Sequence, residues 1–152
     1  MAQPLLHFED FPLGEVFEYG SYRVTAEEIV GFAREFDPQP FHIDAAAAEA
    51  SILGGLCASG WHTCAIMMRM MVDGYLGRSA SMGSSGIEET RWLKPVYAGD
   101  TLTCRRTTLE ARRSARRPEM GVLRFRWELF NLDGDRKTEM TGVTFIRARS
   151  TA

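Results

Sequence analysis

The sequence predicts an α+β domain in which an antiparallel β-sheet wraps around one long, buried helix. Two observations support this prediction. The segment Trp61–Leu76 is apolar almost all round, which is typical of a helix that other elements enclose. Helical segments gather in the first half of the chain and strand-like segments in the second, and this segregation favours a layered α+β arrangement over alternating βαβ units.

Five segments have strand character, one before the long helix and four after it. They are Glu15–Arg23, Gly86–Lys94, Thr101–Ala111, Val122–Asn131 and Lys137–Arg149. The fourth alternates between apolar and charged residues, and Asp133-Gly134 supplies a hairpin turn after it. One helix wrapped by such a sheet is the hotdog architecture, and we expect residues 1–152 to form a single domain of this kind. The sheet would leave one edge strand and its outer face uncovered, which favours a homodimer or a higher oligomer of dimers.

Local signals place the shorter elements. Thr25-Ala-Glu-Glu28 has the form of a capping box and predicts a helix of about three turns. Pro38 and Pro40 disfavour helical geometry at the residues before them, so Asp37–His42 should be a stiff, non-helical connection. Asp44 then caps a short helix that ends before Gly54-Gly55.

Composition narrows the range of partners, cofactors and cellular locations that the sequence allows. The net charge of -2 gives no general attraction to nucleic acid or to an anionic membrane, so we expect neither as a partner. The three cysteines form no C-x-x-C pair and have no nearby histidine ligands, which argues against a disulfide framework and a zinc site. The N-terminus lacks the outline of a signal peptide. We therefore expect a cytoplasmic protein with a small-molecule partner, no metal and no redox cofactor.

A carboxylate and an imidazole lie five residues apart in the proline-rich connection, at Asp37 and His42. These side chains could act together in acid/base chemistry if the loop folds back on itself. From the residues alone, His42 could equally be a hydrogen-bonded structural residue and Asp37 a helix-end residue.

The segment Asp37-Pro-Gln-Pro-Phe-His42, with Ala48 six positions further on, resembles the signature of the MaoC-like dehydratases and (R)-specific enoyl-CoA hydratases. The resemblance extends over nearly the whole chain through Phe11-Pro-Leu-Gly14, Ser59-Gly60 and Leu93-Lys-Pro-Val-Tyr-Ala-Gly-Asp100. It implies a hydro-lyase that adds water reversibly to a trans-2-enoyl-CoA and gives a 3-hydroxyacyl-CoA, with CoA as part of the substrate.

The resemblance also implies roles for individual residues. Asp37 and His42 would be the catalytic pair, and Gly60 would provide an oxyanion-hole N–H at the start of the long helix. Gln39, Ser59 and Trp61 would contribute to substrate binding. The chain departs from the usual pattern at four positions, which puts the acyl substrate in doubt more than the acid/base pair. These are Phe36 for glycine, Gln39 for asparagine, Phe41 for an aliphatic residue and Ser59 for histidine.

Several alternatives stay open from the sequence. A hotdog acyl-CoA thioesterase would direct water at the carbonyl carbon, and a non-catalytic acyl-thioester binder would keep only the fold. His62 is interpreted as helix surface or pocket lining, and the methionines of the long helix as adaptable core packing. An arginine cluster between two strands either holds the phosphates of CoA or is a solvated hairpin. It comprises Arg112, Arg113, Arg116 and Arg117.

Overall fold

Five antiparallel strands form one sheet in the computed structural model, which describes residues 3–150. The strands are β1 (Val16–Arg23), β2 (Ser81–Trp92), β3 (Thr101–Arg113), β4 (Met120–Phe130) and β5 (Arg136–Arg147). Their order across the sheet is β1-β3-β4-β5-β2, so β1 and β2 are the edge strands. Every strand that the sequence predicted is present within this sheet.

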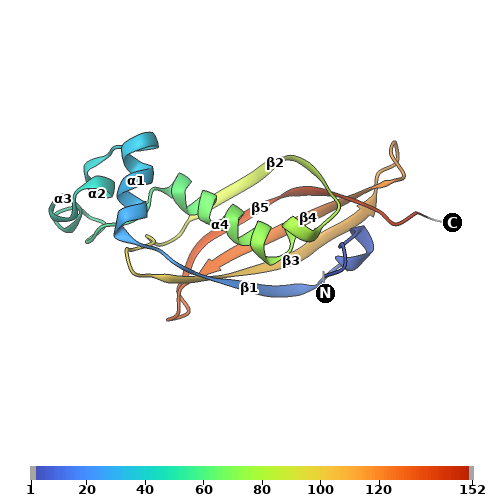
Figure 1. Ribbon diagram of the computed structural model, residues 1–152, viewed down its shortest axis with the longest axis horizontal. Coiled ribbons are helices and arrows are strands. Elements are labelled where there is room, and N and C mark those ends of the chain that lie inside the picture. The colour runs from blue at the N-terminus through green and yellow to red at the C-terminus, as the bar shows by residue number, and fades with distance from the viewer. Residues whose placement is uncertain (1–2, 151–152) are drawn as a thin grey trace.

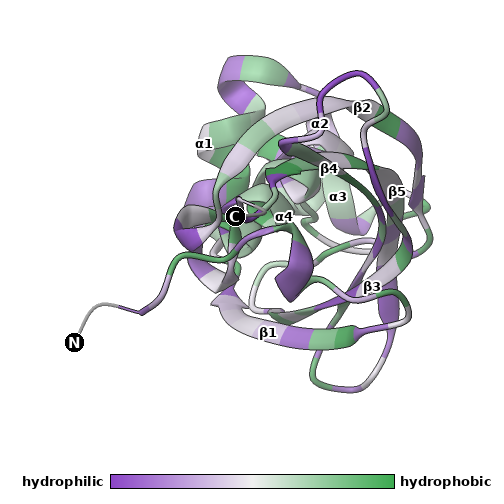
Figure 2. Cartoon of the chain, turned by 90° about the vertical axis from the view of Figure 1, so that its right-hand side faces the viewer, coloured by the Kyte–Doolittle hydropathy of each residue, from purple (hydrophilic) through white to green (hydrophobic). Residues whose placement is uncertain are grey.

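Helix α4 (Gly60–Gly74) runs along the concave face of the sheet, and Figure 2, which looks along the molecule, shows the sheet curling around it. This confirms the predicted α+β fold. The inward-facing residues of β4 are all buried against α4, because the alternation seen in the sequence matches the pleat of the strand. They are Leu123, Phe125, Trp127 and Leu129.

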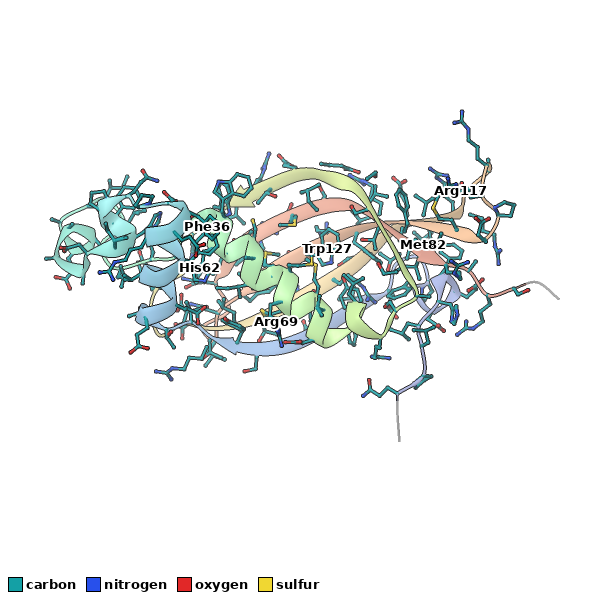
Figure 3. The ribbon with its side chains drawn as sticks, turned by 45° about the horizontal axis from the view of Figure 1, so that its top comes forward. Phe36, His62, Arg69, Met82, Arg117 and Trp127 are labelled. Carbon is teal, nitrogen blue, oxygen red and sulfur yellow. The ribbon has the colours of Figure 1, made fainter. Side chains whose placement is uncertain are left out.

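The enclosure of α4 is incomplete, unlike the sequence prediction. Met68 is 50% exposed and Val72 is 41% exposed, because the sheet covers one side of the helix and leaves the other open. Arg69 projects from the open side in Figure 3 and forms an ion pair with Asp73. None of the helices formed by residues 3–150 has the length and apolar character needed to cross a bilayer.

The remaining helices gather at the end of the molecule where α4 begins (Figure 1). They are α1 (Ala26–Phe36), α2 (Pro40–Ile43) and α3 (Ala45–Glu49), while short 3-10 turns η1 (Phe8–Asp10) and η2 (Leu76–Arg78) lie elsewhere. Both predicted caps are confirmed. The Thr25 hydroxyl accepts the N–H of Glu28 at 3.2 Å, and the Asp44 carboxylate accepts the N–H of Ala47 at 2.9 Å.

Two boundaries differ from the prediction. The connection after Asp37 is not wholly non-helical, because Pro40 begins the one-turn helix α2. Gln39 is extended, as the proline requires, but Pro40 itself occupies the first helical position, where no N–H is needed. Strand β2 begins at Ser81, ahead of the predicted Gly86, because pairing with β5 through several bulges holds a Gly- and Ser-rich segment that carries no alternating pattern.

Candidate active site

Asp37 and His42 are brought together at the end of the molecule where α4 begins. Asp37 caps the C-terminus of α1, and His42 lies in the single turn α2. The Asp37 Oδ2 and His42 Nε2 atoms are 3.5 Å apart. The turn that Pro40 initiates therefore does what the sequence argument required, since it folds the loop back and places both side chains at one point.

His42 is held in a defined orientation. Its Nδ1 lies 2.7 Å from the carbonyl oxygen of Cys57, and a carbonyl oxygen only accepts hydrogen bonds, so Nδ1 must carry the proton. In the neutral ring this leaves Nε2 as an acceptor directed at Asp37. The imidazole is only 6% exposed, so its orientation is also fixed by packing.

Asp37 receives two hydrogen bonds from neighbouring side chains. The Ser59 hydroxyl donates to Oδ2 at 2.6 Å, and the Gln39 amide donates to Oδ1 at 2.7 Å. The Ser59 bond is the main cause that holds the pKa of Asp37 below its usual value; partial burial opposes this effect, and the Gln39 bond and His42 add to it. Asp37 is therefore a carboxylate near neutral pH.

Ser59 stands at the N-cap of α4, and its hydroxyl turns to Asp37 in place of the helix N–H groups. The first N–H groups of a helix have no acceptor within that helix, and they carry a partial positive charge. Gly60, the first residue of α4, is one of these donors and lies on the same cavity as Asp37. The start of α4 thus brings a positive helix end beside the carboxylate and the imidazole.

A cavity of about 490 Å³ opens onto this cluster. All six residues that the sequence assigned to the site line it: Asp37, Gln39, His42, Ser59, Gly60 and Trp61. Ser59 is fully buried behind Asp37, whereas Trp61 is 67% exposed at the cavity wall.

Another part of the cavity wall was not assigned to the site from the sequence. It is the connection from the end of β2 toward β3, residues Trp92–Val96, and Thr138 of β5 lies beside it. Lys94 lines the cavity and is not among the residues that the sequence assigned to the site. The segment that begins at Leu93 contributed to the family resemblance, but its place at the site could not be predicted, because pairing of β2 with β5 is what carries it there.

His62 is not where the sequence interpretation put it. It is buried between α1 and α4, stacked on Phe32 with the ring centroids 4.7 Å apart, and its Nε2 lies 3.3 Å from Glu28. Burial is the main cause that lowers the pKa of His62, against the opposing effect of Glu28. This histidine joins the two helices that carry Asp37 and Gly60.

The arginine cluster lies far from this cavity. Arg117 marks the β3–β4 hairpin in Figure 3, at the opposite end of the molecule from Phe36 and His62. Arg113 there pairs with Glu9. Within one chain the cluster is therefore remote from Asp37 and His42, which favours the solvated-hairpin interpretation over a phosphate site.

The fold and the site together define a class of protein: a single hotdog domain with a carboxylate–imidazole pair at the start of its buried helix. The family profile described as "MaoC like domain" matches residues 10–123, and the chain belongs to this family.

Known relatives cover nearly the whole domain. Protein YdeM of Bacillus subtilis is 32% identical over 119 residues, which is 78% of this chain and 82% of that protein. The crystal structure of a MaoC-like dehydratase from Rhodospirillum rubrum is 38% identical, with a TM-score of 0.88 over 95% of this chain and 99% of that one. A Mycobacterium tuberculosis protein with a double hotdog fold is 16% identical, with a TM-score of 0.79 over 97% of this chain and 46% of that one. This last likeness supports the hotdog fold alone.

Proposed function

We propose that this protein is a hydro-lyase that adds water reversibly across the double bond of a trans-2-enoyl-CoA and gives a 3-hydroxyacyl-CoA. Membership of the MaoC-like family and the 38% identity to a dehydratase support hydratase or dehydratase activity in general. The observation that carries the proposal further is the 3.5 Å separation between Asp37 Oδ2 and His42 Nε2 at a cavity.

These two atoms are both hydrogen-bond acceptors when Asp37 is charged and His42 is neutral. Two facing acceptors need a shared donor, and a water molecule has two O–H groups, one for each. Such a water would be oriented by Asp37 and deprotonated by His42 Nε2. Its oxygen forms the bond to C3 of the enoyl thioester while the π electrons of the double bond move toward the thioester oxygen. The protonated His42 then gives its proton to C2, so that one water is added in all.

The charge that develops on the thioester oxygen needs hydrogen-bond donors in a water-poor site. We propose that the Gly60 N–H is one such donor, because it belongs to the first turn of α4 and lies on the cavity. Trp61 would contact the substrate from the cavity wall. Gln39 and Ser59 border the same space, and their hydrogen bonds to Asp37 would keep its carboxylate aimed at the water.

Two rival functions would use the same cavity. A thioesterase would direct the water at the carbonyl carbon and release CoA thiol, and a non-catalytic protein would bind the acyl thioester unchanged. Incubating the protein with crotonyl-CoA while following double-bond absorbance, free thiol and binding separates all three. Double-bond loss without thiol release supports the hydratase; thiol release or binding without turnover would contradict it.

We further propose that the enzyme works as a homodimer or an oligomer of dimers. Edge strand β2 and the open face of α4 expose apolar side chains on adjoining surfaces, including Met68, Val72 and Ile87. Light scattering after size-exclusion chromatography should give at least twice the chain mass of 17.1 kDa; a monomer at assay concentration would contradict this.

We also propose that the reaction needs no metal and no redox cofactor, since the acid/base pair and the helix end supply the required groups. Dialysis against a chelator should leave the rate of hydration unchanged. The three cysteines are free thiols, two of them buried, which suits a reducing compartment such as the cytoplasm. Full activity in the presence of a thiol reductant would be consistent with this, and loss of activity would contradict it.

A further inference from the structure

A second cavity lies beside α4, beyond the candidate active site. Its volume is about 310 Å³, and its walls come from α4, β2, β4 and β5. Large apolar side chains line most of it, among them Met68, Met71, Ile87, Trp127 and Met140. Within residues 3–150 no charged side chain contributes to its wall. Such a space suits an aliphatic chain and not the phosphates of CoA.

The two cavities are successive parts of one interface between α4 and the sheet. On α4 the first cavity reaches Gly60 and Thr63, and the second begins at Cys64, one position further on. On β5 the first cavity reaches Thr138 and the second begins at Met140, the next residue on the same face of that strand. The residues described here give the cavities no lining residue in common.

Trp92 stands at the boundary between them. Its indole packs so closely on Gly60 that a Cβ at position 60 would lie 2.5 Å from Trp92 Cε2. The ring also meets Trp61 edge-on, with centroids 5.5 Å apart. Burial raises the pKa of the Cys64 thiol, and a hydrogen bond with Trp92 opposes that rise, so the same ring reaches the first residue of the second cavity.

We propose that Trp92 is a specificity-determining residue that closes the catalytic cavity at its acyl end and restricts the enzyme to short-chain acyl thioesters. This inference rests on the proposed function. With the indole in place, an acyl chain extending along α4 from the Gly60 N–H meets Trp92 and cannot enter the apolar space behind it. Without the indole, the two cavities join into one channel.

The orientation of the substrate follows from the charges around the first cavity. Lys94 is the one permanently cationic side chain among the described residues that line it, and it is held at the sheet end by Asp135, with Nζ and Oδ1 2.5 Å apart. The phosphates of the carrier favour that cation. The second cavity has no charged side chain in its wall within residues 3–150, so it is the acyl tail that is directed along α4 toward Trp92.

The test compares crotonyl-CoA with trans-2-decenoyl-CoA in the wild type and in Trp92→Ala. The wild type should prefer crotonyl-CoA, and the variant should raise the ratio of kcat/KM for decenoyl-CoA over crotonyl-CoA at least about fivefold, since each methylene that enters an apolar site is worth roughly fourfold. Trp92 is 48% exposed, so its loss should not unfold the chain. Trp92→Leu provides a second variant in case it does. Leu132→Ala removes another exposed apolar side chain, at the β4–β5 turn away from both cavities, and serves as the control.

A smaller rise in both Trp92 variants, or a wild type that hydrates the two substrates equally well, would overturn the proposal. Failure of the hydratase assignment is separable from this, because it would abolish hydration of both substrates by every variant. In that case titration calorimetry with saturated butyryl-CoA and decanoyl-CoA gives the readout. If Trp92 separates the two cavities, Trp92→Ala should bind decanoyl-CoA more tightly relative to butyryl-CoA than the wild type does. A ratio of the two dissociation constants that is unchanged in the variant would refute this role of Trp92.

Discussion

An acidic and a basic side chain from other elements lie near each end of helix α4. The surroundings of these two pairs differ. At the N-terminal end, Asp37 and His42 face a cavity and are separated by 3.5 Å. At the C-terminal end, Arg106 of β3 forms a direct ion pair with Glu15, and its side chain is 3% exposed.

The Arg106 guanidinium is enclosed by aromatic rings. Its central carbon lies 4.5 to 5.1 Å from the ring centroids of Phe11, Phe17, Tyr75 and Phe125. Tyr75 is the C-cap of α4, so the buried cation also lies at the negative end of the helix. The comparison shows what makes a charged pair reactive: Arg106 is enclosed by the Glu15 carboxylate and four aromatic rings, whereas Asp37 and His42 leave acceptor positions directed at a cavity.

The largest effect is expected for Asp37 and His42, the pair that faces the cavity. Asp37→Asn and His42→Ala should each lower the rate of enoyl-CoA hydration by about a hundredfold to ten-thousandfold, the usual contribution of a positioned acid or base. Both should keep their circular dichroism spectrum and oligomeric state, because the loop backbone is set by Pro38 and Pro40. Asp73→Asn, at an exposed carboxylate near the other end of α4, is the matched control and should retain full activity. Near wild-type rates in both site variants would disprove the proposed mechanism.

Substitution of Arg106, which pairs with Glu15 among the aromatic rings, should change the stability of the fold and not the chemistry. Arg106→Met leaves Glu15 without its partner and removes four cation–π contacts, which should lower the free energy of unfolding by about 3–5 kcal/mol. Arg105→Met, the next residue on the opposite face of β3, breaks an exposed pair with Glu18 and should cost less than about 1 kcal/mol. Urea denaturation of both variants gives the comparison. Equal losses would show that enclosure by the rings adds nothing.

The sequence predicts the elements around both ends of α4 better than it predicts their contacts. The alternation in β4 and the caps at Thr25 and Asp44 depend on neighbours in sequence, and each was confirmed. The apolar run predicted helix α4 itself but not the side of it that the sheet leaves open. The pairing of Arg106 with Glu15 joins residues far apart in the chain, and no local pattern marks it.

The same limit applies to the site. Asp37 and His42 share one loop, so their spacing and its prolines were enough to bring them to attention. The Cys57 carbonyl that sets the tautomer of His42 is a backbone atom, and Trp92 reaches Gly60 only through the pairing of β2 with β5. His62 could not be placed from sequence, since its burial depends on how α1 packs on α4.

A smaller effect should appear in the pH dependence. The folded pKa of Asp37 is held below the usual 3.8, chiefly by Ser59, so the hydrogen-bonded carboxylate stabilises the fold above the unfolded pKa, and this contribution is lost as pH falls through the lowered folded pKa. Ser59→Ala removes the main cause of the lowering and should raise the pKa of the Asp37 carboxyl, measured by NMR titration of its side-chain carbon. Gln39→Ala removes a weaker cause and should raise the same pKa less. A carboxyl titration that stays in place in Ser59→Ala would show that the Ser59 hydrogen bond does not hold the Asp37 pKa down.

The smallest effect is expected at Lys94, which lines the cavity that contains Asp37 and His42. If Lys94 attracts the phosphates of the carrier, Lys94→Ala should raise the KM for crotonyl-CoA by about two- to fivefold, the size typical of an exposed ion pair. The KM for the crotonyl thioester of N-acetylcysteamine, which lacks the phosphates, should not change. Asp135 competes for the same ammonium group, so Asp135→Asn should lower the KM for the CoA thioester. A rise in KM for both thioesters in Lys94→Ala would instead indicate that the lysine shapes the cavity wall, because only contact with the carrier distinguishes the two substrates.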